Sequence, residues 1–237
     1  MAGFKTHLTF SGVLGVGYGG AAFWFYGVPW PTCVLAGGLC GRSGMLPDLD
    51  SDSSEPVRES MAFAAAVAPM MLLHRLQQLG FSHEAMVLLG AAMYVLVRYG
   101  AGSLLKRFTV HRGMFHSLPT AIVFGELTFL LASGDDLRIR GFKAGAVVIG
   151  YVSHLLLDEL YSVEWRRGHL RLKHSFGTAL KLFSSSRSAS LLAYGHLLLL
   201  AALIFCDPAT MHAPNVPGRG DSIPQAAART LDQLLHR

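Results

Sequence analysis

The chain alternates long apolar stretches with short polar connections, and most of these stretches approach the length of a membrane-crossing helix, about 20 residues. The six longest cover residues 8–26, 61–79, 85–105, 118–132, 144–160 and 191–206, and a shorter one covers residues 32–45. Gly15 and Gly19 lie four residues apart in the first stretch and predict a face for close helix packing. The pattern predicts an all-α, polytopic membrane protein with about six to seven membrane-embedded helices.

The polar and basic positions divide the chain further. Residues 1–206 form the predicted helical membrane domain, and within it residues 165–183 alternate basic with apolar and aromatic side chains. Such a segment is expected to lie on the lipid headgroups. Residues 207–237 are rich in Pro and Gly at first and polar later, which predicts a disordered tail with a short terminal helix.

Composition excludes most soluble folds, because 51% of residues are apolar and only 15% are charged, against roughly 25% in soluble domains. The mean hydropathy is +0.40. The net charge of +5 does not indicate a nucleic-acid partner, since the basic residues lie between apolar stretches, where topology and anionic lipids explain them. Three cysteines, all in or beside apolar segments, give neither a disulfide framework nor a cysteine zinc site.

Four short polar segments, called islands below, carry side chains of the types that bind metals in proteins. They are Thr6-His7, Pro47-Asp48-Leu49-Asp50, the segment from His111 to Ser117, and the segment from His154 to Asp158. Ionisable groups near or within membrane helices are costly and therefore indicate function. His154 and Asp158 stand four residues apart, so they project from one helix face. A simple hydrogen bond between these two side chains is the alternative.

His111 and His116 stand five residues apart, which is unsuitable for one helix face. Gly113 and the Ser117-Leu118-Pro119 sequence predict instead a loop followed by a helix start, with Ser117 as N-cap. A loop can bring both imidazoles to one ion, and the N-terminal N–H groups of the next helix favour an anion. A basic anchor at the membrane interface is the alternative for this segment.

Asp48 and Asp50 stand two residues apart and face the same side if their loop is extended. His7 alone is weak evidence for a metal ligand, and only the presence of the other islands supports that assignment. If residues 8–26 and 32–45 form a hairpin and the later stretches pair in the same way, all four islands reach one membrane interface. Twelve Lys and Arg residues then lie on that side and seven on the other, so the positive-inside rule makes the side cytoplasmic.

The ordered set of islands resembles the YdjM-like family of membrane-bound metal-dependent hydrolases, whose type member is a LexA-regulated inner-membrane protein. The family pattern is Thr-His, Leu-Pro-Asp-x-Asp, His-Arg-Gly-x-x-His-Ser and Ser-His-x-x-x-Asp, and it is matched over about residues 1–160. After Asp158 the family's turn with Thr and Gly is replaced by Glu159-Leu160-Tyr161-Ser162. The resemblance implies a polytopic helical fold in the inner membrane and a metal-dependent hydrolase activity.

Imidazole and carboxylate together suit Zn²⁺ best here, with Mn²⁺ or Fe²⁺ as alternatives, and the set can hold one ion or two. The predicted ligands are His7, Asp48, Asp50, His111, His116, His154 and Asp158. Asp50 is the predicted catalytic base, and Arg112 is predicted to steady an anionic substrate. The expected substrate is a phosphoester or ester of a lipid or amphiphile. The alternative is a non-enzymatic membrane protein with a structural or transport-related metal site.

Overall fold

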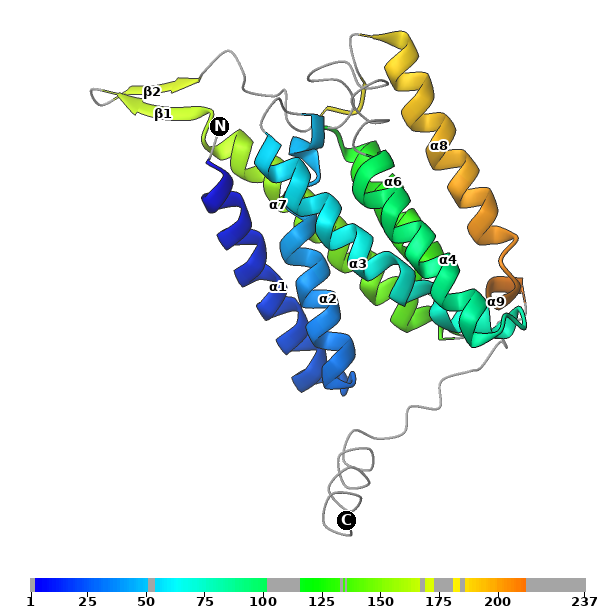
Figure 1. The fold of residues 1–237 in the computed structure, drawn as a ribbon. Helices are drawn as coiled ribbons and strands as arrows, with labels where there is room; N and C mark the ends of the chain where they lie inside the picture. The colour runs from blue at the N-terminus through cyan, green and yellow to red at the C-terminus, as the bar shows by residue number, and fades with distance from the viewer. Residues whose placement is uncertain are drawn as a thin grey trace.

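In the computed structural model, each predicted apolar stretch is helical over most of its described residues, and the helices pack side by side in a bundle (Figure 1). The structure describes residues 3–50, 54–101, 116–132, 134, 136–166, 169–172, 181–183 and 186–211. The long helices are α1 (Phe4–Tyr26), α2 (Trp30–Ser43), α3 (Ser54–Gln78), α4 (His83–Val95), α6 (Leu118–Leu131), α7 (Leu137–Leu160) and α8 (Arg187–Phe205). The predicted helical fold is confirmed.

Shorter elements join these helices. A 3-10 turn, η1 (Pro47–Asp50), follows α2, a π-helical stretch, η2 (Leu96–Ala101), continues α4, and α9 (Pro208–Met211) follows α8. Strands β1 (Val163–Arg166) and β2 (His169–Leu172) form an antiparallel hairpin in which Val163 pairs with Leu172. This hairpin is an exception to the all-α prediction, and it occupies part of residues 165–183, which were predicted as an interfacial segment.

The first two helices form the hairpin on which the predicted convergence of the polar islands depends. Gly27, with φ of 63°, ends α1 in the left-handed conformation, and Pro29 directly precedes α2. A Cβ atom on Gly19 would lie 2.6 Å from the Cys33 carbonyl oxygen, so the two backbones approach closely because the glycine lacks a side chain. The predicted hairpin and its glycine face are both confirmed.

Helix α7 is the central element, because it packs against α1, α2 and α6. Its backbone at Gly150 lies directly against Cys40 and Ser43 of α2. On another face, Tyr151 and Leu155 are fully buried together with Ala121 of α6. The C-terminal half of α7, which carries two predicted ligands, is therefore held from two sides.

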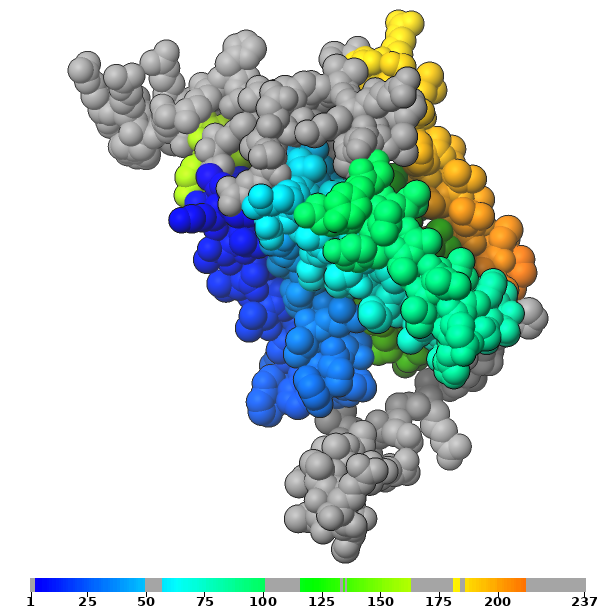
Figure 2. Space-filling view, viewed as in Figure 1, coloured from blue at the N-terminus to red at the C-terminus, as the bar shows by residue number. Residues whose placement is uncertain are grey.

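The outer helices present apolar side chains to the surroundings. None of the residues of α8 is buried, and this helix runs along the edge of the bundle (Figure 2). By length and composition, α1 and α8 are the described helices that could cross a membrane. This criterion supports fewer spans than the six to seven predicted, because α2 and α6 have 14 residues each and α7 carries charged residues near both ends.

The two ends of the bundle differ in content. The N-terminal end of α1, η1 and the C-terminal end of α7 lie at one end, whereas the α1–α2 turn and α9 lie at the other (Figure 1). At this second end, Asp207 bridges two arginines: its Oδ2 lies 2.6 Å from Arg75 Nη2 and 2.7 Å from Arg140 Nη2. Asp207 was predicted to begin the disordered tail, but it is buried and followed by α9. Residues 212–237 lie outside the described residues.

Candidate metal centre

Five of the seven predicted ligands come together at the end of the bundle where α1 begins. His7 lies in the first two turns of α1, Asp48 in η1, His116 directly before α6, and His154 and Asp158 in the last two turns of α7. Their side chains approach one another from four separate parts of the sequence. The i, i+4 spacing of His154 and Asp158 on one helix face is confirmed by a distance of 3.6 Å between His154 Nε2 and Asp158 Oδ2.

Asp158 faces the three imidazoles. Its Oδ1 lies 3.4 Å from His7 Nε2, and its Oδ2 lies 3.9 Å from His116 Nε2. The rings of His7 and His154 stack with a centroid distance of 3.8 Å. Each histidine therefore directs its Nε2 atom, rather than Nδ1, toward the same carboxylate.

Asp48 completes the cluster from the opposite side. Its Oδ1 lies 3.6 Å from His154 Nε2 and 3.7 Å from His116 Nε2. The Asp48 side chain is 27% exposed, whereas the side chains of His7, His154 and Asp158 are at most 5% exposed. The cluster is thus closed on the side of α1 and α7 and accessible beside Asp48.

The protonation of His154 follows from its backbone contact. His154 Nδ1 lies 2.6 Å from the carbonyl oxygen of Gly44, and a carbonyl can only accept, so Nδ1 donates. In the neutral imidazole, Nε2 then carries a lone pair, and this buried atom has no hydrogen-bond partner among the described residues. A histidine held through Nδ1 with Nε2 directed inward is the usual arrangement of a metal ligand.

The distances in the cluster fit a bound cation better than direct hydrogen bonds. Protein N–H···O bonds are commonly about 2.9 Å long, whereas the nitrogen–oxygen separations here run from 3.4 to 3.9 Å. Ligands at about 2.0–2.1 Å from a tetrahedral Zn²⁺ are about 3.3–3.4 Å apart. A cation at their centre would also balance the negative charge of the two carboxylates. The donor set therefore fits a divalent metal ion.

Three predicted site residues are not tested by this geometry. Asp50 is the last residue of η1, and its side chain lies outside the described part of the chain. His111 and Arg112 also lie outside the described residues. Their assignments as ligand, base or substrate contact remain predictions.

Two glycines contribute to the site without any side chain, and the sequence analysis missed them. Gly44 supplies the carbonyl that orients His154, and no side-chain pattern reveals a backbone acceptor. Gly150 lets α7 approach α2 one turn before His154. Its spacing of four residues from His154 is a signal that could have been used, because it puts the glycine on the ligand face.

Comparison with known protein families shows to which family this chain belongs. Residues 1–207 match the family described as YdjM inner membrane protein. The chain belongs to this family. The match reaches residue 207 and so extends beyond residues 1–160, where the motifs end, through β1, β2 and α8. Membership makes this an inner membrane protein.

Neither a search of curated proteins nor a search of solved structures gave a match.

Proposed function

We propose that this protein is a membrane-embedded metal-dependent hydrolase that acts on a phosphoester or ester of a lipid or amphiphile at the cytoplasmic face of the inner membrane. The observation that carries the proposal is the convergence of three imidazole Nε2 atoms and two carboxylates at separations of 3.4–3.9 Å. A mixed set of imidazole and carboxylate suits Zn²⁺, Mn²⁺ or Fe²⁺. Zn²⁺ is the proposed ion, because it accepts both ligand types and can expand from four to five ligands.

The described ligands account for a single ion. Two groups of three ligands are present, His7–His154–Asp158 and Asp48–His116–His154, and both contain His154. Because one imidazole nitrogen donates its lone pair to one ion, the two groups together make one centre. A second ion would need the side chains of Asp50 and His111.

When bound, a divalent ion polarises a phosphoryl or carbonyl oxygen and acidifies water near it. The chain's own residues have distinct roles in this proposal. Gly44 fixes the ring of His154, and Asp158 would supply negative charge toward the ion. Asp48, on the accessible side, meets the substrate first. Asp50 is the proposed base and Arg112 the proposed contact for an anionic group.

The membrane arrangement supports a substrate that is itself a membrane component. The proposal takes six to seven helices as membrane-embedded, with the shorter α2 and α6 spanning as parts of the bundle rather than alone. The outward faces of α4 and α8 are apolar, including Leu88, Val95, Leu191 and Phe205. Because the cluster lies at one end of the bundle, its substrate would be met at an interface.

A non-enzymatic protein with a structural or transport-related metal site is the competing proposal. Structural zinc sites are closed by four protein ligands, whereas catalytic sites keep one side open. The 27% exposure of the Asp48 side chain favours the catalytic alternative. Transporters commonly bind near the bilayer midplane, which a cluster at the end of the bundle does not resemble.

The proposal is tested by elemental analysis of the detergent-purified protein, followed by phosphoester and ester assays on the same samples. We expect near-stoichiometric metal and hydrolysis, both lost in a His154→Ala/Asp158→Ala double variant and both kept in His74→Ala, which replaces an exposed histidine. Metal without hydrolysis of any lipid ester would favour the structural or transport alternative. Wild-type protein that takes up no metal, even on reconstitution, would overturn the proposal.

A further inference from the structure

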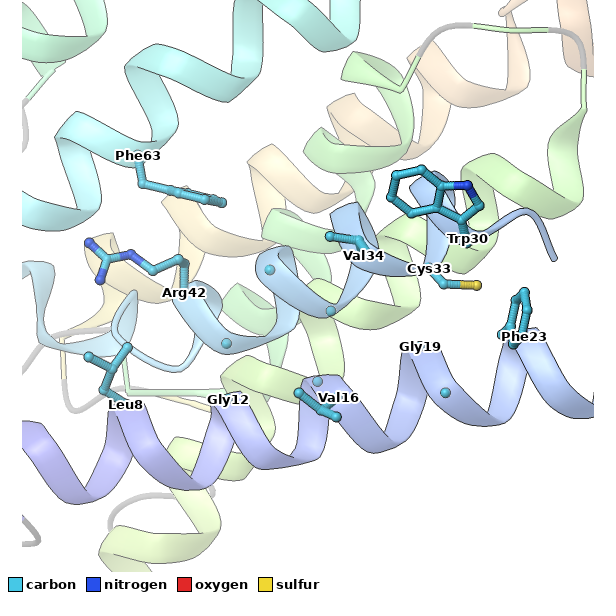
Figure 3. Close-up of a pocket in the computed structure, with 15 residues that line it drawn as sticks. Leu8, Gly12, Val16, Gly19, Phe23, Trp30, Cys33, Val34, Arg42 and Phe63 are labelled. Carbon is cyan, nitrogen blue, oxygen red and sulfur yellow. The ribbon is translucent and has the colours of Figure 1, made fainter.

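A groove of about 750 Å³ runs along the junction of α1 and α2 (Figure 3). Its walls are apolar or glycine, apart from one basic side chain among the residues that line it. From one end to the other the lining includes Leu8, Val16, Val34, Phe23 and Trp30. Between Leu8 and Phe23, α1 rises by about 22 Å, so the groove is long and narrow.

The glycines along the groove fall into two groups. A Cβ atom on Gly19 or Gly37 would meet the backbone of the opposite helix, at 2.6 Å and 3.0 Å, so helix packing accounts for them. A Cβ atom on Gly12, Gly20 or Gly38 would meet nothing within 4 Å. Packing does not require glycine at these three positions, and larger side chains there would occupy the groove.

The charged end of the groove is formed by Arg42. Its guanidinium lies 5.7 Å from the centre of the Phe63 ring, and its Nη2 lies 3.7 Å from Glu59 Oε2. The Arg42 side chain is 22% exposed, and its buried Nε atom has no hydrogen-bond partner among the described residues. Because Glu59 is half-exposed and also lies near Arg58, Arg42 retains donors for an anionic group.

The charged end lies beside the metal centre. Leu8 directly follows His7, and Arg42 precedes Gly44, whose carbonyl orients His154, by two residues. Figure 3 shows Leu8, Arg42 and Phe63 together at one end, with Phe23, Trp30 and Cys33 at the other. A molecule lying in the groove with its anionic group at Arg42 would therefore direct that group toward the end of the bundle that holds the ligands.

We propose that the α1–α2 groove binds one acyl chain of an anionic membrane lipid, with the headgroup phosphate at Arg42. The length of about 22 Å exceeds half of the roughly 30 Å hydrocarbon core, which suits one chain of one leaflet. The inference rests on the proposed function, because it names an anionic acyl lipid as the substrate class. Binding itself requires no hydrolysis.

Photocrosslinking tests the proposal. The full-length protein is placed in phosphatidylcholine nanodiscs with a small fraction of phosphatidylglycerol carrying a diazirine in its acyl chain, and labelled peptides are identified by mass spectrometry. We expect label on α1 and α2, reduced several-fold by Gly20→Leu and by Gly38→Leu. Gly17→Leu is the matched control, because Gly17 lies on α1 outside the groove and its Cβ also has free space. Arg42→Gln should lower labelling by about fivefold, the effect of roughly 1 kcal/mol per basic residue.

The outcomes separate the groove from the catalytic proposal. Labelling of α1 and α2 that is equal in wild type, Gly20→Leu and Gly38→Leu overturns the groove as the binding site. Equal labelling by a phosphatidylcholine probe overturns the proposal that the bound lipid is anionic. Thermal unfolding in detergent, measured on each sample, identifies a variant that is misfolded, and the second glycine variant then decides. A protein that shows groove-dependent labelling but hydrolyses no lipid would keep the binding site and overturn only the proposed activity.

Discussion

The Nδ1 atom of His154 on α7 lies 2.6 Å from the carbonyl oxygen of Gly44 at the end of α2. This contact makes the orientation of a proposed metal ligand depend on the packing of two helices. The packing in turn depends on Gly150, one turn before His154, whose position against Cys40 and Ser43 leaves no room for a side chain. A backbone carbonyl and the absence of a methyl group therefore contribute to the orientation of this proposed ligand.

Replacing Gly150 by alanine should weaken metal binding although no ligand changes. The added methyl group would push α7 from α2, lengthen the His154–Gly44 hydrogen bond and release the imidazole ring. Loss of such an outer contact commonly costs about 10–100-fold in metal affinity. Competition against a chromophoric zinc chelator measures this change in the detergent-purified protein.

Gly141→Ala is the control for that substitution. Gly141 lies on the same helix, and a Cβ atom there would meet nothing within 4 Å, so zinc affinity should equal that of the wild type. Unchanged affinity in Gly150→Ala would mean that the Gly44 contact does not orient the ligand.

The two described aspartates should differ in their effect on metal retention. Asp158 is buried and faces three imidazoles, whereas Asp48 is partly exposed and faces two. Asp158→Asn should therefore abolish metal retention during dialysis against a chelator, while Asp48→Asn should retain a measurable fraction. Elemental analysis per mole of membrane-extracted protein gives both values, with Glu84→Gln as an exposed carboxylate control. The reverse order would assign the main ligand to the accessible side.

Gly19→Leu should destabilise the α1–α2 hairpin. Its Cβ atom would lie 2.6 Å from the Cys33 carbonyl oxygen, and overpacking of this kind typically costs about 1–3 kcal/mol. Thermal unfolding in detergent should show a lower midpoint than for the wild type. Gly17→Leu, on the same helix with open space around it, should have the same unfolding midpoint as the wild type. Equal midpoints for Gly19→Leu and Gly17→Leu would rule out close packing at Gly19.

The helices and the His154–Asp158 pair could be predicted because their signals are local. Apolar stretches locate the helices, the Pro29 break separates α1 from α2, and the four-residue spacing puts His154 and Asp158 on one face. The β hairpin was missed because residues 165–183 were interpreted through their mixture of basic and apolar side chains. Alternation of basic and apolar residues also favours a strand, and the sequence alone does not distinguish that from an interfacial segment.

What the sequence could not predict depends on contacts between distant residues. Arg75 and Asp207 are separated by 132 positions, and Arg140 and Asp207 by 67. No spacing rule connects such residues, and a single aspartate after an apolar helix resembles the start of a polar tail. The role of the Gly44 carbonyl also could not be predicted, because every residue has a carbonyl and only the fold determines which one accepts the hydrogen bond from His154.

Asp207 has an unusual ionisation that follows from this buried bridge. Burial raises the pKa of its carboxyl group, but hydrogen bonds from Arg140 and Arg75 outweigh that effect and hold the pKa well below its usual range. An aspartate in the unfolded chain has a pKa of about 3.9. Because the folded pKa is the lower one, the bridge stabilises fully above that value and its contribution is lost as the pH falls toward the folded pKa.

Asp207→Asn should therefore lower the unfolding midpoint strongly at pH 7 and less at pH 3. At neutral pH the substitution leaves Arg140, which is 1% exposed, as a buried charge without its carboxylate partner, and removing one member of a buried pair costs about 3–5 kcal/mol. Thermal unfolding in detergent at pH 7, 5 and 3 measures the difference from the wild type. Glu84→Gln, at an exposed position in the first turn of α4, should lower the midpoint at pH 7 much less, because an exposed charge at a helix N-terminus contributes only weakly to stability. If Asp207→Asn melted with the wild type at pH 7, the bridge would not hold this end of the bundle together.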